Sequence, residues 1–221
     1  MIIVLLGAPG AGKGTLATAI KDQLDVHHIS TGDLIRAEIK GGTAIGLEIK
    51  RYVESGGLVP DEVVTRMIEG KVSTTASDGK GYMFDGFPRT SAQAVDLDKV
   101  LAKNKLAVDF ALYMEASLDV VLLRLTGRRV CRACGALYHL KNMPPKKDGI
   151  CDKCGGEIYQ RTDDNEETIK KRMTVYNEST RPIIDHYKAQ GKLKTVNADA
   201  GAEHVKASFL KILGARHDKK A

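Results

Sequence analysis

Gly7-Ala8-Pro9-Gly10-Ala11-Gly12-Lys13-Gly14-Thr15 follows an apolar run typical of a strand and opens a segment typical of a helix. Glycines in such a loop allow backbone N–H groups to close around phosphate oxygens, and the helix N-terminus adds partial positive charge. The lysine of such a loop reaches the β- and γ-phosphates, and a hydroxyl lies beside Mg²⁺. The stretch therefore predicts a phosphate-binding loop (P-loop), whose expected contacts with a nucleoside triphosphate are Gly10, Ala11, Gly12, Lys13, Gly14 and Thr15.

Short apolar runs alternate with helical patterns along the rest of the chain. Three of the runs are almost continuously apolar, as strands buried on both faces are. Such alternation implies a parallel sheet with helices on both faces. We therefore predict an α/β fold with a P-loop NTPase-type core, a five-stranded parallel sheet. The expected strands are Met1–Gly7, His27–Ser30, Tyr82–Asp85, Phe110–Glu115 and Lys194–Asn197.

Two stretches interrupt the alternation and predict two inserted domains. Residues 30–59 have the pattern of helices and turns, with a Gly-Gly pair towards each end. Residues 127–164 hold all four cysteines and show little helical periodicity. Glycine-bounded excursions of this kind are hinge candidates. The core is then expected to comprise residues 1–29, 60–126 and 165–221.

Local signals predict where two of the core helices begin. Ser117 precedes a helical apolar stripe and suits an N-cap, because its hydroxyl can accept a hydrogen bond from the first turn. Thr90 and Gln93 have the spacing of a capping box, in which each side chain bonds the other residue's backbone N–H.

The cysteines form two Cys-x₂-Cys pairs, Cys131 with Cys134 and Cys151 with Cys154, separated by sixteen residues. This is the spacing of a tetrahedral Cys₄ zinc site. Four protein ligands leave no open position, so the expected Zn²⁺ is structural. It would replace the core that fewer than about forty residues cannot build alone. The nearby His139 is expected to be a surface residue and not a ligand.

The P-loop departs from the general pattern, because Gly14 stands between the lysine and Thr15. Gly-Lys-Gly-Thr resembles the nucleoside monophosphate kinases, and the whole run resembles the adenylate kinases. The resemblance extends along nearly the whole chain and includes the long lid with a Cys₄ site that some bacterial members carry. Its further motifs are Ser30-Thr31-Gly32-Asp33 with Arg36, Asp85-Gly86-Phe87-Pro88-Arg89 with Gln93, Gly127-Arg128-Arg129, and Gln160-Arg161-Thr162-Asp163-Asp164 with Arg172.

The resemblance implies an ATP:AMP phosphotransferase, in which MgATP and AMP give two ADP. Residues 30–59 would then bind AMP, and residues 127–164 would form the lid. The implied catalytic residues are Lys13, Asp85, Arg89, Arg128, Arg161 and Arg172. Beyond the P-loop, the implied ATP contacts are Arg124, Arg128, Leu137 and Tyr138. The implied AMP contacts are Thr31, Arg36, Gly57, Leu58, Val59, Gly86, Phe87, Pro88, Arg89, Gln93, Arg161 and Arg172.

Two positions depart from the family pattern. Gly57 stands where some members carry a long basic side chain, but the expected contact there is through the backbone. Asn197-Ala198 replaces the Asp-Gly that is often found near the ATP adenine.

The chemistry of phosphoryl transfer also explains the arginines independently of the resemblance. Phosphoryl transfer requires two anions held in line and the charge on the moving group neutralised. Guanidinium groups bind phosphate in bidentate fashion and stay charged. Arg124 and Arg128 are four residues apart, so they share one side of a helix. Asp85 ends an apolar strand near the P-loop, which is the usual place for a carboxylate that binds Mg²⁺ directly or through water.

Composition and charge limit the partners and the cellular compartment that we expect for the protein. The formal net charge of +6 favours anionic partners, and no stretch approaches the length of a membrane span. The N-terminal apolar run lacks a preceding basic flank and is too short for a signal peptide. We expect a cytoplasmic monomer that binds ATP, AMP and ADP and associates with neither membrane nor nucleic acid.

Three other interpretations remain open. A kinase for UMP, CMP or GMP would share the loop and the arginines, because base choice depends on few contacts around Gly86 and Gln93. A nucleic-acid-binding zinc ribbon would explain the cysteines and the charge, but aromatic residues for stacking are scarce and the P-loop would have no role. A signalling or motor NTPase hydrolyses its nucleotide, whereas two groups of phosphate-binding arginines indicate a second nucleotide as acceptor.

Overall fold

The computed structural model describes residues 1–217, without the side chains of Asp22, Ala76 and residues 215–217. Its centre is a five-stranded sheet of strand order β2-β3-β1-β4-β8, in which all neighbouring strands are parallel. The predicted five-stranded parallel core is confirmed, and each predicted strand starts within one residue of the observed one. The strands are β1 (Ile2–Gly7), β2 (Val26–Ser30), β3 (Gly81–Asp85), β4 (Phe110–Glu115) and β8 (Leu193–Asn197).

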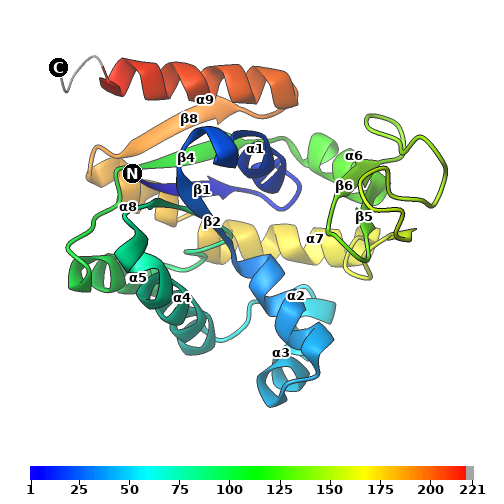
Figure 1. The fold of residues 1–221 in the computed structure, drawn as a ribbon, viewed down its shortest axis with the longest axis horizontal. Coiled ribbons are helices and arrows are strands. Elements are labelled where there is room, and N and C mark those ends of the chain that lie inside the picture. The colour runs from blue at the N-terminus through cyan, green and yellow to red at the C-terminus, as the bar shows by residue number, and fades with distance from the viewer. Residues whose placement is uncertain (218–221) are drawn as a thin grey trace.

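Helices connect the strands and cover both faces of the sheet, as parallel strand connections require (Figure 1). Short 3₁₀ turns lie at Lys21–Gln23 and Ala76–Asp78, and a π-helical turn at Tyr176–Thr180 follows α7. The α-helices are α1 (Lys13–Ile20), α2 (Thr31–Gly41), α3 (Ala44–Glu54), α4 (Asp61–Thr75), α5 (Ser91–Lys103), α6 (Leu118–Gly127), α7 (Glu166–Val175), α8 (Ile183–Ala189) and α9 (Ala202–His217).

The central strand β1 is buried on both faces, because successive side chains point to opposite sides. Leu5 packs in a cluster with Leu16 of α1 and Phe209 of α9. Val4 packs on the opposite face with Ile68 of α4. Figure 1 shows α9 on one side of the sheet and α4 and α5 on the other. The continuous apolar run of β1 is thus explained by two core layers, one on each face.

The structure confirms the Ser117 cap and corrects the capping box. Ser117 Oγ accepts a hydrogen bond from the Val120 N–H, at the start of α6. Thr90 Oγ1 accepts from the Gln93 N–H at 3.1 Å, which is one half of the predicted box. Gln93 Oε1, however, accepts from the Arg89 N–H at 2.7 Å instead of the Thr90 N–H. The prediction of a complete box was wrong, because a different backbone donor occupies the glutamine.

Residues 30–59 form the helical excursion that the sequence predicted. Helices α2 and α3 make up most of it, and they lie to one side of the sheet in Figure 1. After α3, the N–H groups of Gly56 and Gly57 bond the carbonyls of Val53 and Tyr52, which ends the helix in a tight turn.

Residues 127–164 form a second excursion built from short strands. It contains β5 (Arg128–Cys131), β6 (Leu137–His139) and β7 (Ile158–Tyr159), which make a three-stranded antiparallel sheet of order β6-β5-β7. Its core is small: Cys131, Tyr138 and Cys151 are buried, with Ala136 and Ile158 packed against them. So small an apolar cluster gives the segment little stability of its own.

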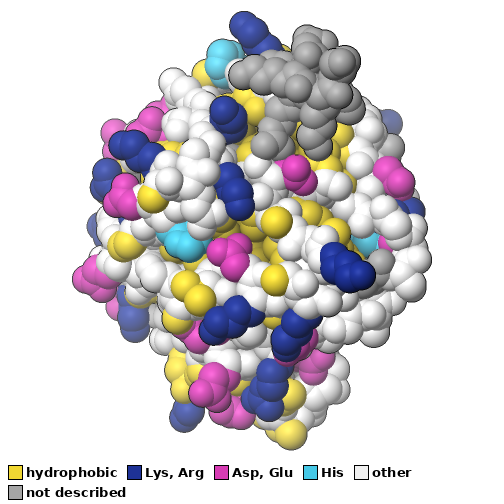
Figure 2. All heavy atoms as spheres, turned by 90° about the vertical axis from the view of Figure 1, so that its left-hand side faces the viewer, with side chains coloured by type: hydrophobic (Ala, Val, Ile, Leu, Met, Phe, Trp, Pro, Cys, Tyr) yellow, Lys and Arg dark blue, Asp and Glu magenta, His cyan; other side chains and the backbone are white. Residues whose placement is uncertain are grey.

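The predicted last part of the core, residues 165–221, contains α7, α8, β8 and α9; residues 218–221 lie outside the described residues. Within residues 1–217, no helix combines the length and apolarity that a membrane span requires. On the face seen in Figure 2, basic and acidic side chains are interspersed, with neither sign gathered into one large patch.

Candidate active site

The P-loop connects β1 to α1 as predicted. Gly12 has a left-handed backbone (φ 99°) and precedes α1 without a side-chain cap, so the first N–H groups of the helix remain available to an anion. Gly10 has φ 80°, and a Cβ there would lie 2.9 Å from Leu125 Cγ of α6. Only glycine fits at this turn, because a side chain would meet both backbone strain and the packed helix.

Lys13 lies inside the loop that it closes. Its Nζ donates hydrogen bonds to the Gly7 carbonyl (2.7 Å) and the Ala8 carbonyl (2.9 Å). Burial lowers the pKa of Lys13 to about 8, and the charge of Asp85 opposes this shift. A bound anion would stabilise the charged form of this desolvated ammonium group, because an opposite charge offsets the effect of desolvation on its pKa.

Asp85 ends β3 beside the P-loop, as predicted. A Cβ at Gly14 would lie 3.4 Å from Asp85 Oδ2, so the extra glycine leaves this carboxylate open towards the loop. On another side, His28 Nε2 lies 3.6 Å from Asp85 Oδ2, and it is buried without a hydrogen-bond partner among the described residues. A carboxylate next to an unpaired polar atom fits a hydrated Mg²⁺, which keeps several waters and uses few protein ligands.

Five predicted arginines form one group: Arg89, Arg128 and Arg172 lie close enough to Lys13 to lower its pKa, and Arg36 and Arg161 lie close to other arginines of the group. They come from separate parts of the chain: Arg36 from α2, Arg89 from the loop after β3, Arg128 from β5, Arg161 from the segment before α7 and Arg172 from α7. The prediction that Arg128 shares a helix with Arg124 was wrong, because α6 ends at Gly127 and the backbone of Arg128 is extended. Burial, together with the charges of neighbouring arginines, lowers the pKa values of Arg89 and Arg161 to about 10. Arg161 Nε is buried and unpaired within the described residues. The fold thus concentrates cations that repel one another, which favours a polyanionic ligand.

Aspartates hold two of these arginines. Arg128 binds Asp164 through two hydrogen bonds, Nε to Oδ2 at 2.7 Å and NH2 to Oδ1 at 2.5 Å. Arg172 NH1 bonds Asp163 Oδ2 at 2.9 Å and approaches Asp164 Oδ1 at 3.4 Å. Asp164 is fully buried, and Asn165, not the aspartates, caps α7. The Asp163-Asp164 pair therefore fixes guanidinium groups from two elements.

Several residues predicted to bind the acceptor nucleotide lie around the Gly86 carbonyl. Thr31 Oγ1 donates to it at 2.7 Å, and Arg89 Nε donates to it at 2.9 Å. Arg36 forms an ion pair with Asp33 one helical turn away. Thr31, Gly86 and Arg89 are thus brought together, and the same turn leads directly to Gln93.

The other residues predicted to bind the acceptor nucleotide lie partly in the core and partly in the segment between α3 and α4. The Phe87–Pro88 peptide bond is cis, and the Phe87 side chain is buried in the core. Gly57, Leu58 and Val59 lie between α3 and α4, and Val59 packs in the same core cluster as Phe87. For these residues, a role in nucleotide binding stays a prediction.

Arg124, which is predicted to contact ATP, connects three parts of the chain. Its NH2 donates to the Ala198 carbonyl at 2.7 Å, and its NH1 lies 3.4 Å from the Ala11 carbonyl. The guanidinium group therefore joins α6 to the P-loop and to the segment after β8. Leu137 and Tyr138 lie on β6, and the Tyr138 hydroxyl is directed to the cysteine cluster and not to the P-loop. Their contact with an ATP base stays a prediction.

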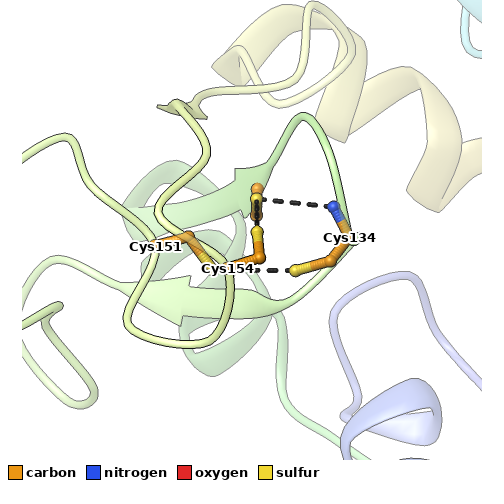
Figure 3. Close-up of side chains that lie close together, drawn as sticks. Cys134, Cys151 and Cys154 are labelled. Carbon is orange, nitrogen blue, oxygen red and sulfur yellow. Dashed lines mark hydrogen bonds between the residues drawn. The ribbon is translucent and has the colours of Figure 1, made fainter.

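The four cysteines converge as predicted, and Figure 3 shows the side chains of Cys134, Cys151 and Cys154 close together. All four Sγ atoms lie within 4.8 Å of one another. The Cys131–Cys154 and Cys134–Cys151 distances between Sγ atoms are 3.5 and 3.6 Å, and all four thiols are free. Thiolates around a tetrahedral Zn²⁺ with Zn–S bonds of about 2.3 Å lie about 3.8 Å apart. The cluster therefore fits a zinc ion.

Tyr138 reinforces this cluster. Its hydroxyl lies 3.3 Å from Cys151 Sγ and accepts a hydrogen bond from the Asp152 N–H at 2.7 Å. Because the backbone group is the donor, the hydroxyl hydrogen is free to bond the sulfur. This hydrogen bond is the largest of several causes that lower the pKa of Cys151 to about 6; backbone N–H groups of Lys153 and Cys154 contribute to the same shift. At Cys151, the thiolate form that a metal requires is therefore favoured at neutral pH.

Comparison with known families decides what this combination of sites represents. A sequence model of adenylate kinases matches residues 5–192. The chain belongs to the adenylate kinase family. Three relatives named adenylate kinase match almost end to end. The Geobacillus sp. (strain WCH70) protein is 46% identical over 97% of this chain and 99% of its own. The Desulfitobacterium hafniense (strain DSM 10664 / DCB-2) protein is 45% identical over 99% and 100%, and the Syntrophobacter fumaroxidans protein is 47% identical over 97% and 100%.

Sequence reasoning missed two residues that the structure connects to the site. Asp61 binds both Thr90 and Gln93, although from the sequence it is an ordinary acidic residue in the first turn of a helix. His139, expected to be a surface residue, is partly buried and lies where β6 meets α6. Its Nε2 is 3.2 Å from the Leu123 carbonyl, and its Nδ1 accepts from the N–H groups of Lys141 and Asn142. The contacts of Asp61 and the contact between His139 and Leu123 join separate elements, so no local pattern indicated them.

Proposed function

We propose that the protein reversibly transfers the γ-phosphoryl group of ATP to AMP and so forms two ADP. The observation that carries this proposal is the convergence of the P-loop lysine with five arginines from separate elements. Lys13 and the α1 N-terminus suit the phosphates of the donor. Arg36 and Arg89, beside Thr31 and Gly86, suit the phosphate of an acceptor.

Between the two phosphates, Arg128, Arg161 and Arg172 would neutralise the charge of the group in transfer. Charge neutralisation and in-line positioning are the main requirements of phosphoryl transfer, so no general base is needed. Mg²⁺, held beside Asp85 and Thr15, would shield the donor phosphates. Because Asp163 and Asp164 bind two of these arginines, a nucleotide that enters the site must compete with carboxylates.

We propose a division of labour among three parts of the chain. Residues 30–59 would bind AMP, residues 127–164 would form a lid over ATP, and residues 1–29, 60–126 and 165–221 would form the core. Closure of both insertions would exclude water and bring the two phosphates into line, and reopening would limit turnover. Without such exclusion, water would compete with AMP as the acceptor.

The zinc ion is proposed to be structural. It would be held by Cys131, Cys134, Cys151 and Cys154, which leave no position open for a substrate. We also propose that the protein works as a monomer in the cytoplasm, where thiols stay reduced and available to a metal. Light scattering on the purified protein measures the oligomeric state directly.

The decisive experiment compares AMP, GMP, CMP and UMP as acceptors, with MgATP as the donor and ADP formation as the readout. The proposal expects AMP to dominate by kcat/KM. A dominant rate with another base would reassign the acceptor, whereas ATP hydrolysis without any acceptor preference would remove the kinase assignment.

A further inference from the structure

Asp61 links two segments that are both expected to contact the acceptor nucleotide. It is the first residue of α4 and directly follows Val59-Pro60. Thr90 Oγ1 donates a hydrogen bond to its Oδ2 at 2.6 Å, and Gln93 Nε2 donates to its Oδ1 at 2.7 Å. Gln93 is only 2% exposed, so the amide is held inside the protein, where competition from bulk water is small.

Two neighbours fix which end of the Gln93 amide is nitrogen. A carboxylate only accepts hydrogen bonds, so Asp61 requires Nε2 on its side. A backbone N–H only donates, so the Arg89 N–H requires Oε1, which it contacts at 2.7 Å. Turning the amide over would place Oε1 against the carboxylate and Nε2 against the Arg89 N–H. Both hydrogen bonds would then be lost in a buried setting, which makes the reversed amide unfavourable.

The fixed amide keeps one donor and one acceptor for a ligand. An amide has two hydrogens on Nε2 and two lone pairs on Oε1, and the contacts within the described residues use one of each. Adenine presents an acceptor at N1 beside a donor at its 6-amino group, which matches one amide hydrogen and one lone pair. A 6-oxopurine presents a donor at N1 and an acceptor at O6, which is the reverse pattern and matches only the turned amide.

We propose that Asp61 is a positioning residue that sets the selectivity for the acceptor base. It holds the Gln93 amide in the orientation that pairs with adenine and rejects 6-oxopurines. This inference rests on the proposed function, because it assigns Gln93 to the base of the acceptor. Thr90 supports the arrangement from the other side, since its hydroxyl binds the second oxygen of the same carboxylate.

The test replaces Asp61 by asparagine, which has nearly the same shape but can also donate. In Asp61→Asn, the new Nδ2 can bind Oε1 of a turned Gln93, so one of the two restraints is lost. We expect the ratio of kcat/KM for AMP to that for IMP to fall about tenfold, the size of one hydrogen bond to a charged group. The change should lie in the KM of the nucleoside monophosphate, with the KM of ATP and the melting temperature nearly unchanged.

Glu62→Gln is the matched control. Glu62 lies in the same first turn of α4 and is exposed, so its substitution removes the same charge from the same helix N-terminus. This control should leave the AMP-to-IMP ratio unchanged. Should Asp61→Asn fail to fold, Asp61→Ser supplies the same test, because serine suits a helix start but cannot hold both Thr90 and Gln93.

A double-mutant cycle tests whether Asp61 acts through Gln93. In a Gln93→Ala background, Asp61→Asn should cause no further loss of selectivity. An additional loss of similar size, an unchanged AMP-to-IMP ratio in Asp61→Asn, or a parallel rise in the KM of ATP would each overturn the inference. These outcomes differ from failure of the proposed function, in which the unmodified protein would not prefer AMP as acceptor.

Discussion

At the scale of single residues, the positive charges of the site lie on partly buried side chains. Lys13 bonds two loop carbonyls, and its pKa is lowered by burial. Arg89 and Arg161 are likewise partly buried, and desolvation is the main cause that lowers their pKa values to about 10. Desolvation of these cations lowers the free energy of unfolding. A bound phosphate would offset this loss, because it would form charge-assisted hydrogen bonds with them.

Lys13→Met separates function from stability at this scale. The substitution removes the charge that would reach the phosphates, so kcat should fall by at least roughly 10²–10³-fold, as for other lost transition-state donors. The melting temperature should stay the same or rise, because a buried charge is replaced by an apolar side chain of similar length. Steady-state kinetics and calorimetry measure the two effects. Near-normal turnover would contradict the P-loop assignment.

At the scale of elements, residues 127–164, the proposed lid, have few packing contacts of their own and a cysteine cluster that fits a metal ion. The sheet β6-β5-β7 encloses few apolar side chains, and its cysteines fit one metal ion. The Tyr138 hydroxyl bonds the Cys151 sulfur, so a residue of the small core also supports the metal ligands.

Removal of zinc, by chelation or by Cys154→Ser, should destabilise the lid selectively. A chain of this size loses about 2–4 °C in Tm for each kcal/mol, and the lid should melt before the core. Hydrogen exchange should therefore show loss of protection in residues 127–164 and little change in the central sheet. Alanine in place of Asp148, an exposed lid residue outside the cluster, is the control. An immediate and complete loss of activity in a still-folded enzyme would argue for a catalytic metal.

The junction of α6 with the lid makes a second test at this scale. A Cβ at Gly127 would lie 2.3 Å from Nε2 of His139, whose ring is held by hydrogen bonds at both nitrogens. Gly127→Ala should therefore displace β6 from α6, lower the Tm and reduce kcat. The double variant Gly127→Ala/His139→Ala should recover part of the Tm, because the clashing ring is gone.

Gly70→Ala controls for helix propensity in this test. Gly70 lies in α4 with open space around its Cβ position, so alanine there should stabilise the helix by up to about 1 kcal/mol. If Gly127→Ala behaved like Gly70→Ala, the steric contact with His139 would have no effect on the lid.

At the scale of the whole molecule, Lys13 and the five arginines bring cations from six parts of the chain close together. The charges of Arg89, Arg172 and Arg128 all lower the pKa of Lys13, and the charge of Arg172 lowers the pKa of Arg89. Neighbouring carboxylates offset only part of this charge. A ligand that bridges both phosphate sites should therefore bind and stabilise the entire fold.

Two adenosines joined by five phosphates provide such a ligand. At about 100 times its Kd, any ligand specific for the folded state adds about 2.7 kcal/mol of stability. For a chain of this size that corresponds to a rise of roughly 5–10 °C in Tm. Differential scanning calorimetry should show the rise for the unmodified protein and a smaller one for Lys13→Met. Equal rises in both proteins would indicate that the ligand does not reach the P-loop.

The P-loop, the strands and the cysteine pairs could be predicted because their signals are local. Glycine spacing fixes a turn, an apolar run fixes a doubly buried strand, and two Cys-x₂-Cys turns fix a metal site. The family motifs could likewise be recognised at their positions in the chain. None of these features depends on what lies opposite them in space.

Only the tertiary structure shows which side chains from distant elements contact one another. Asp61 reaches Gln93 from 32 positions away, and Asp164 reaches Arg128 from 36. Contacts of this kind depend on the relative placement of separately formed elements, which one sequence does not reveal. The same reason explains why Gln93 was predicted to bond the Thr90 N–H and instead bonds that of Arg89. The sequence by itself thus determined the elements and their chemistry, whereas packing decided which buried polar groups became partners.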